Sequence, residues 1–140
     1  IPVVYASRAN QALAINWKIK FNETAKIPSF ANSLPEVNHN EMTGYDVIPA
    51  TRALSKQLHF IFLEDQADGE HIRLRMKVTR DLYKARGLNS TVVSVEGANV
   101  FLKIFSSLVL ADWTAFNLAL HYGVEADKVP MVEDFKKKLK

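Results

Sequence analysis

Three short apolar runs alternate with longer amphipathic stretches along the chain. The runs cover residues 1–6, 58–63 and 91–95, and each is rich in β-branched or aromatic side chains. Uninterrupted runs of this length are typical of strands that are buried on both faces of a parallel sheet covered by helices. A weaker fourth strand is expected at residues 45–48.

Helical periodicity fills the intervals between the predicted strands. From residue 9 to residue 21 apolar side chains recur every four positions, which is the spacing of one helix face. Residues 72–87 alternate partly like a strand, but an every-fourth apolar row and the length of the segment favour a helix. A last helix is predicted after Pro130. The pattern predicts an α/β fold with a doubly wound, mostly parallel sheet flanked by helices.

The longest apolar segment, residues 99–122, has apolar side chains on nearly every side. This pattern predicts a buried central helix that ends at Gly123, and such a helix can also supply a subunit contact. Asp112 lies in the middle of the segment and Lys103 near its start. A central Asp costs about 2.5–3.5 kcal/mol on membrane insertion, so we expect no membrane span.

Length and composition fit one domain. The chain has 140 residues, is 48% hydrophobic and contains no cysteine, which excludes disulfides, thiolate nucleophiles and cysteine metal sites. These features suit a cytoplasmic protein. The chain opens at Ile1 directly in a strand pattern, so we expect it to be a piece of a longer protein.

The net charge of +3 comes from the last thirteen residues. Residues 128–140 contain five Lys and two acidic side chains, and the remainder is neutral. The cluster falls at the end of a predicted helix, where cations interact favourably with the helix dipole. We therefore expect Lys136, Lys137 and Lys138 to be mostly solvated, and we expect no nucleic-acid partner.

Two polar stretches between apolar elements carry the candidate chemistry. Glu23 lies in the first stretch and His39 in the second, sixteen residues further on, and amide side chains flank both. Because unpaired polar groups are costly to bury, such a cluster points to a site rather than to core filling. A carboxylate with an imidazole can move protons at neutral pH.

The other candidates have simpler interpretations. His59 lies in a predicted strand and is expected to be a packed core residue, whereas His71 and His121 are expected at the surface. Ser7 follows the first strand, where it can bind a ligand at the carboxyl edge of the sheet or, more commonly, cap the next helix. The histidine spacings match no metal motif, and the five glycines form no phosphate loop, so no cofactor is expected.

The two polar stretches also carry a resemblance to a known family. They read Trp17-Lys18 followed by Asn22-Glu23-Thr24-Ala25-Lys26-Ile27-Pro28, and then Pro35-Glu36-Val37-Asn38-His39-Asn40-Glu41. In this order they resemble the C-terminal half of the bifunctional phosphoglucose/phosphomannose isomerases of the sugar isomerase (SIS) superfamily. Thr24 replaces the usual second Asn of the first motif. The likeness extends loosely over the long helix around Asp112 and the closing Gly123-Val124 and Val129-Pro130-Met131.

The resemblance implies the role of each site residue. It implies that the whole chain, residues 1–140, is a single SIS domain with a flavodoxin-like fold, the C-terminal half of a two-domain dimeric enzyme. The enzyme would interconvert glucose 6-phosphate and fructose 6-phosphate through an enediol. Glu23 matches the base at C1 and C2, and His39 matches the ring-opening histidine that the neighbouring subunit supplies. Lys136 matches a ring-opening lysine, with the adjacent Lys137 and Lys138 as alternatives. Ser7, Asn22 and Lys26 are the predicted substrate contacts.

Two points stay open at the level of sequence. A non-catalytic SIS module that binds a sugar phosphate is the alternative function, because a fold does not fix an activity. Whether mannose 6-phosphate is a substrate depends on pocket shape. The phosphate-binding loop of the family belongs to the N-terminal SIS domain, which these residues do not include, so the fragment alone is expected to be inactive.

Overall fold

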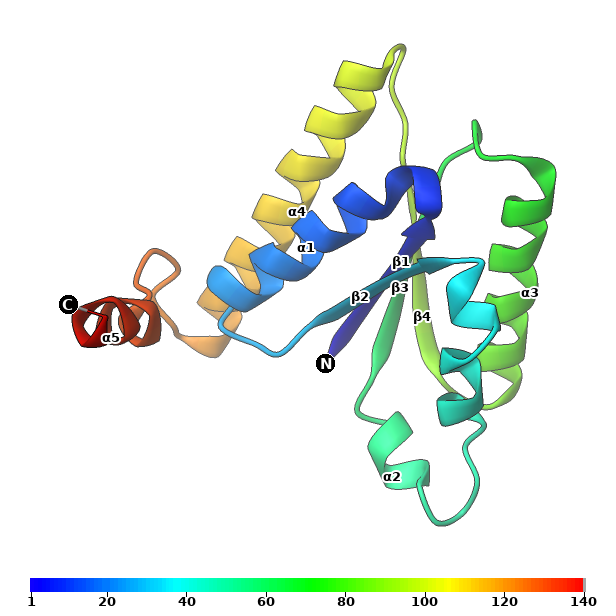
Figure 1. The fold of residues 1–140 in the computed structure, drawn as a ribbon, viewed down its shortest axis with the longest axis horizontal. Helices are drawn as coiled ribbons and strands as arrows, with labels where there is room; N and C mark the ends of the chain where they lie inside the picture. The colour runs from blue at the N-terminus through cyan, green and yellow to red at the C-terminus, as the bar shows by residue number, and fades with distance from the viewer. Residues whose placement is uncertain (140) are drawn as a thin grey trace.

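Four parallel strands form the centre of the fold, in the spatial order β2-β1-β3-β4 (Figure 1). The computed structural model describes residues 1–139. The strands are β1 (Pro2–Ser7), β2 (Phe30–Leu34), β3 (His59–Glu64) and β4 (Asn89–Ser94). The helices are α1 (Gln11–Glu23), α2 (Arg52–Ser55), α3 (Glu70–Ala85), α4 (Val100–Tyr122) and α5 (Pro130–Lys138). The predicted fold class, a parallel sheet flanked by helices, is confirmed.

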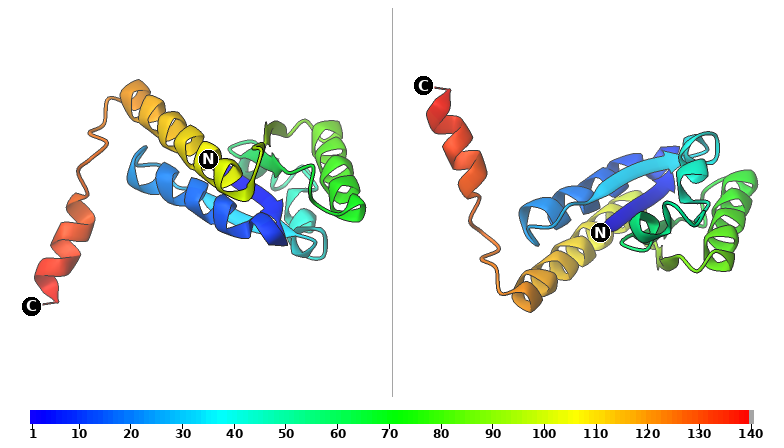
Figure 2. Two further views of the ribbon diagram at one scale, coloured as in Figure 1. Left: turned by 90° about the horizontal axis from the view of Figure 1, so that it is seen from above. Right: turned by 90° about the horizontal axis from the view of Figure 1, so that it is seen from below.

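Helices lie on both faces of the sheet (Figures 1 and 2). On one face α1 and α4 pack against the sheet through a cluster that includes Leu13, Trp17 and Ala111. On the other face α3 and the irregular segment 36–47 enclose a second cluster around Tyr5 and Tyr83. The order β2-β1-β3 places a topological switch between β1 and β3, because their connections leave toward opposite sides.

Two strand predictions are wrong, both at the edges of the sheet. The fourth strand is β2, whereas residues 45–48 form the end of a 3-10 turn and a bend. β2 reads Phe-Ala-Asn-Ser-Leu and lacks both an apolar run and an apolar alternation. β4 is an edge strand with mostly exposed side chains, so it is not buried on both faces as predicted.

The predictions for the histidines in the strands and helices have different outcomes. His59 is exposed instead of packed in the core, and its Nε2 lies 2.8 Å from Thr91 Oγ1 on the neighbouring strand. Burial of part of the ring and the nearby N-terminal ammonium lower the pKa of His59. His71 and His121 are exposed, as predicted.

Helix α4 has the predicted extent but not the predicted burial. It ends at Gly123, whose φ of 66° is the left-handed conformation that glycine adopts without strain. Its buried side chains are only four small ones spaced by four residues, Ser107, Ala111, Ala115 and Ala119. These small residues allow close approach to α1, where Trp17 Nε1 donates a hydrogen bond of 3.0 Å to Ser107 Oγ. The prediction of a buried central helix is therefore wrong for this chain.

By length and composition alone, α4 is long and apolar enough to span a membrane. Its charged residues are nevertheless paired inside the domain. Asp112 lies 2.7 Å from Lys20 of α1, and Lys103 lies 2.6 Å from Asp65, which follows β3. One side of the helix packs against α1 and the sheet. The opposite side is apolar and exposed.

Helix α5 begins at Pro130, as predicted, and projects away from the sheet (Figures 1 and 2). None of its described side chains is buried. Lys136, Lys137 and Lys138 occupy its last turn and are exposed, as predicted, while Lys140 lies outside the described residues.

Candidate functional site

Glu23 ends α1 in a turn that its neighbours hold in place. Asn22 Nδ2 donates a hydrogen bond of 2.9 Å to the carbonyl oxygen of Ile27. Lys26, with a φ of 58°, donates from Nζ to the carbonyl oxygens of Glu23 and Ala126. Asn22 and Lys26 therefore shape the turn and fasten the α4–α5 connection to it. Whether they also contact a substrate stays a prediction.

The Glu23 side chain is left exposed by this arrangement. Among residues 1–139 its carboxylate has no hydrogen-bond or ion-pair partner. It borders a hollow of about 460 Å³ whose other wall is the first turn of α5, from Val129 to Val132. The fold thus brings the predicted base next to the helix that carries Lys136.

The second motif follows β2 and is fastened by Glu41. The Glu41 carboxylate accepts hydrogen bonds from Tyr5 Oη at 2.6 Å, from Tyr45 Oη at 3.2 Å and from Asn32 Nδ2. Burial, the neighbouring Tyr83 and the Glu41 carboxylate raise the pKa of Tyr5 far above its usual range. The Tyr5 phenol therefore stays protonated and remains a donor to Glu41 at any physiological pH.

The amide side chains on either side of His39 are also engaged. Asn38 Nδ2 donates to Thr79 Oγ1 of α3 at 2.6 Å, and Asn40 Nδ2 donates to the Glu36 carboxylate at 2.6 Å. His39 itself is exposed, and no partner for its ring lies within residues 1–139. The prediction that it lies outside the packed core is confirmed. The polar residues of this motif thus build a rigid support and leave one imidazole accessible.

Glu23 and His39 lie on either side of β2 along the chain, toward opposite ends of this strand. Glu23 precedes β2, and His39 follows it. The five residues of β2 extend about 15 Å at the usual rise per residue. Within one chain the length of β2 therefore separates this carboxylate from this imidazole.

The three clustered lysines differ in their partners. Lys137 Nζ lies 3.3 Å from Asp134 Oδ1. Within the described residues Lys136 and Lys138 have no carboxylate partner, so both ammonium groups are available to a ligand. Both side chains sit in the last turn of α5, beyond the hollow next to Glu23.

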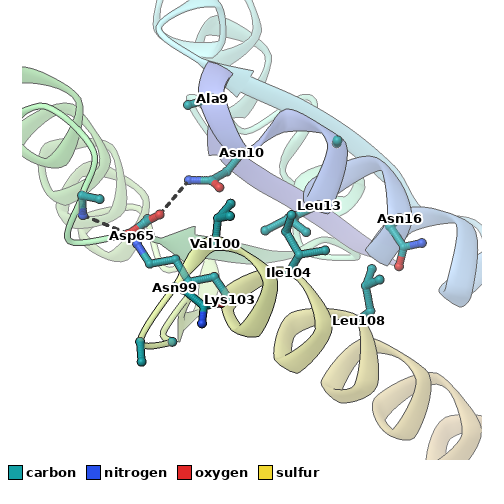
Figure 3. A pocket seen from close by; sticks show the side chains of 14 residues that line it. Ala9, Asn10, Leu13, Asn16, Asp65, Asn99, Val100, Lys103, Ile104 and Leu108 are labelled. Carbon is teal, nitrogen blue, oxygen red and sulfur yellow. Dashed lines mark hydrogen bonds and ion pairs between the residues drawn. The ribbon is translucent and has the colours of Figure 1, made fainter.

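Ser7 lies at the carboxyl end of β1 and contacts Asn10, which lines a cavity of about 800 Å³ between α1 and the start of α4 (Figure 3). It is buried, and its Oγ accepts hydrogen bonds from the backbone and side-chain nitrogens of Asn10 at 3.2 and 3.3 Å. The hydroxyl therefore caps the following turn. A substrate contact for Ser7 stays a prediction.

The polar end of this cavity is closed by a network around Asp65. Its carboxylate pairs with Lys103 Nζ at 2.6 Å and accepts bonds from Asn10 Nδ2 at 3.3 Å and the Ala67 N–H at 2.9 Å. Burial raises the pKa of Asp65, but these partners outweigh it and hold the pKa below its usual range. Asp68 also accepts from Asn10. Lys103 balances the charge of Asp65, and Asp68 has no cationic partner among the described residues, so these three groups sum to a negative charge that disfavours a phosphate.

Comparison with known proteins identifies the family. The model of the bacterial phospho-glucose isomerase C-terminal SIS domain matches residues 1–139. The chain belongs to this family. Curated relatives are named bifunctional phosphoglucose/phosphomannose isomerases, from Thermoplasma volcanium at 33% identity and from Aquifex aeolicus at 29% identity. The chain is covered almost completely by these matches, at 99% and 100%, but it spans only 43% and 42% of the relatives.

Solved structures agree with the SIS fold. A glucose-6-phosphate isomerase like protein from Thermus thermophilus superposes with a TM-score of 0.69 at 21% identity, over 92% of this chain and 42% of that one. The C-terminal domain of glucosamine-fructose-6-phosphate aminotransferase from Francisella tularensis gives 0.66 at 15% identity, over 91% and 37%. At these identities the likeness shows the fold alone. Within residues 1–139 no cluster of metal-ligating side chains is found.

Sequence reasoning missed the structural role of Glu41 in this SIS domain. The residue stands in the second motif, two positions after His39, and the motif alone does not show which side chains reach it. Its partners Tyr5, Asn32 and Tyr45 come from three separate elements. The available signal is the presence of tyrosines in or near apolar runs, since a buried phenol requires a hydrogen-bond acceptor.

Replacing Glu41 by Ala is expected to lower the free energy of unfolding by about 1–3 kcal/mol, because it leaves the buried Tyr5 hydroxyl without an acceptor. Urea denaturation measures the effect as a lower midpoint at an unchanged slope. Glu36→Ala is the matched control, since Glu36 is exposed in the same motif. Equal stability of the two variants would contradict the supporting role of Glu41.

Proposed function

We propose that this chain is the C-terminal catalytic domain of an aldose–ketose isomerase acting on hexose 6-phosphates. The substrates would be glucose 6-phosphate and fructose 6-phosphate, and possible use of mannose 6-phosphate rests on the names of the relatives. The proposal rests on one observation, the presence of a single accessible acid–base side chain in each motif. The surrounding polar side chains are committed to internal hydrogen bonds, while Glu23 and His39 remain exposed and unpartnered within residues 1–139.

In the proposed reaction Glu23 acts as the base. Its carboxylate takes the proton from C2 of the open-chain aldose, which gives an enediol, and returns the proton to C1 to give the ketose. O1 gains a proton when the enediol forms, and O2 loses a proton when the ketose forms. Atoms and charge therefore balance without a metal or another cofactor. An exposed, unpaired carboxylate suits this role because it can approach the substrate.

Ring opening needs an acid and a base at the ring oxygen and O1. We assign these roles to His39 of a neighbouring subunit and to Lys136. Glu23 precedes β2 and His39 follows it, and their separation along this strand supports a shared site in a homodimer. The adjacency of Glu23 to the start of α5 supports the contribution of Lys136 from the same chain. A cytoplasmic location follows from the substrates, which are intermediates of sugar metabolism.

The phosphate group is assigned to the N-terminal SIS domain of the full-length protein. Sugar-phosphate sites use oriented N–H groups and hydroxyls around the phosphate. In the described residues, the start of α1 presents Asp65 and Asp68 instead, and the Ser7 hydroxyl is engaged by Asn10. Residues 1–139 therefore contain the proposed acid–base groups, and no phosphate anchor is found among them.

The 140-residue chain alone is expected to show no isomerase turnover with millimolar fructose 6-phosphate in a coupled assay. Without the phosphate anchor C1 and C2 are not held over Glu23, and positioning supplies about 7–11 kcal/mol of such a barrier. The full-length protein under the same conditions is the positive control. Turnover by the fragment near that of the full-length protein would contradict this division of roles.

The same samples distinguish the non-catalytic alternative. Calorimetric titration of the full-length protein with fructose 6-phosphate measures binding independently of turnover. Binding without turnover in the full-length protein would replace the enzyme by a sugar-phosphate-binding module.

A further inference from the structure

The side of α4 that faces away from α1 is apolar along its whole length. At 100° per residue it lies opposite the buried row that runs from Ser107 to Ala119. Its large side chains are between 40% and 62% exposed and are Leu102, Phe105, Val109, Leu110, Trp113, Phe116 and Leu120. We call these seven residues the outer face of α4.

One polar residue of α4, the uncharged Ser106, lies on this face beside Phe105 and Trp113. Thr114 Oγ1 and Asn117 Nδ2 donate to carbonyl oxygens of their own helix, each at 2.7 Å. The charged side chains Lys103 and Asp112 are paired with Asp65 and Lys20. A helix that faces water normally presents charged side chains there. A continuous apolar strip of this kind marks a contact surface.

We propose that the outer face of α4 packs against the N-terminal part of the full-length chain. The chain spans 43% and 42% of two curated relatives and 42% of the Thermus thermophilus structure, so more than half of each protein lies outside the matched region. The matched family is itself a C-terminal domain. The full-length chain therefore offers a covalently attached occupant of ample size.

The direction of the strands supports the same occupant. β1 begins, and α4 ends, at the amino edge of the sheet, because α4 returns from the carboxyl end of β4. A segment that precedes Ile1 therefore enters at the end of the sheet where α4 terminates (Figure 1). Tethering at this place gives the preceding domain a high effective concentration at the outer face.

The size and chemistry of the surface fit a permanent contact. α4 has 23 residues and is about 35 Å long. Stable interfaces bury about 800 Å² per partner, and permanent ones are more apolar than transient ones. A strip of seven large apolar side chains without an unpaired charge has the character of a permanent interface.

Trp113 is a natural reporter of this contact. It is 60% exposed at the middle of the outer face, whereas Trp17 is 2% exposed in the core. The difference in fluorescence between the wild-type full-length protein and its Trp113→Phe variant isolates the emission of Trp113. We expect this emission at short wavelength and protected from acrylamide, at every protein concentration. Emission at long wavelength with full quenching would overturn the proposal.

A charge-insertion variant separates the possible occupants. Phe105→Glu with Leu120→Glu in the full-length protein is expected to make Trp113 accessible and to split thermal unfolding into two transitions, with the molar mass unchanged. Leu74→Glu with Val78→Glu on α3 is the matched control, since these residues are exposed to a similar degree. If the variant instead halves the molar mass in light scattering, or Trp113 loses protection on dilution, the occupant is a second copy and the proposal is wrong.

Discussion

Replacing Glu23 by Gln in the full-length protein is expected to lower turnover by about 10²–10⁴-fold with little change in substrate affinity. The amide keeps the size of the side chain and cannot accept the C2 proton. The turn is expected to keep its shape, because Asn22 and Lys26 hold it through backbone carbonyl oxygens and not through the Glu23 carboxylate. A coupled assay of both sugar-phosphate directions gives kcat and KM separately.

Glu70→Gln is the matched control for this substitution. Glu70 is an exposed carboxylate in the first turn of α3, which covers the other face of the sheet. It should retain the wild-type rate. If Glu23→Gln retains activity within a few-fold of the wild type, Glu23 is not the base, and the second motif has to be searched for it.

The sequence predicts the buried elements of this fold well and its edges poorly. β1 and β3 are continuous apolar runs, because both of their faces are covered. In β2 the Asn32 side chain donates to Glu41, and the Ser33 side chain is buried. The polar residues of this strand therefore follow its hydrogen bonds and not an apolar period. Periodicity alone does not reveal such a strand.

The misjudged burial of α4 has a different cause. Its composition is that of a helix covered on all sides, and within residues 1–139 only the row of small residues facing α1 is covered. A hydrophobic pattern indicates which side chains are buried in the whole protein. It does not indicate which segment covers them. The mismatch between pattern and burial is therefore itself the observation that points to a missing neighbour.

The candidate site shows the same division. The motifs single out Glu23 and His39, and the structure leaves both exposed. The sequence does not tell that Lys26 and Glu41 are engaged in holding the motifs, because Ala126 and Tyr5, two of their partners, are distant along the chain. Hydrogen-bond partners of polar residues depend on tertiary contacts, which single-sequence patterns do not encode.

Mixing full-length Glu23→Gln and His39→Ala subunits, each inactive alone, is expected to restore about a quarter of the wild-type activity. Random exchange makes half of the dimers hybrid, and each hybrid has one site with both groups intact. The physical reason is the position of the two residues on either side of β2, with about 15 Å of strand between them. The coupled assay after subunit exchange measures the recovery.

The exchange itself has to be measured, because an unmixed sample also shows no recovery. Subunits that carry different affinity tags and are purified in tandem give the hybrid fraction. A Glu23→Gln, His39→Ala double variant mixed with the wild type is the control, since neither site of that hybrid has both groups and its activity follows the residual wild-type dimers alone. If tandem-purified hybrids of the two single variants have no activity, Glu23 and His39 do not come together across subunits. Each site would then use Glu23 and His39 of the same chain, contrary to their positions at the two ends of β2.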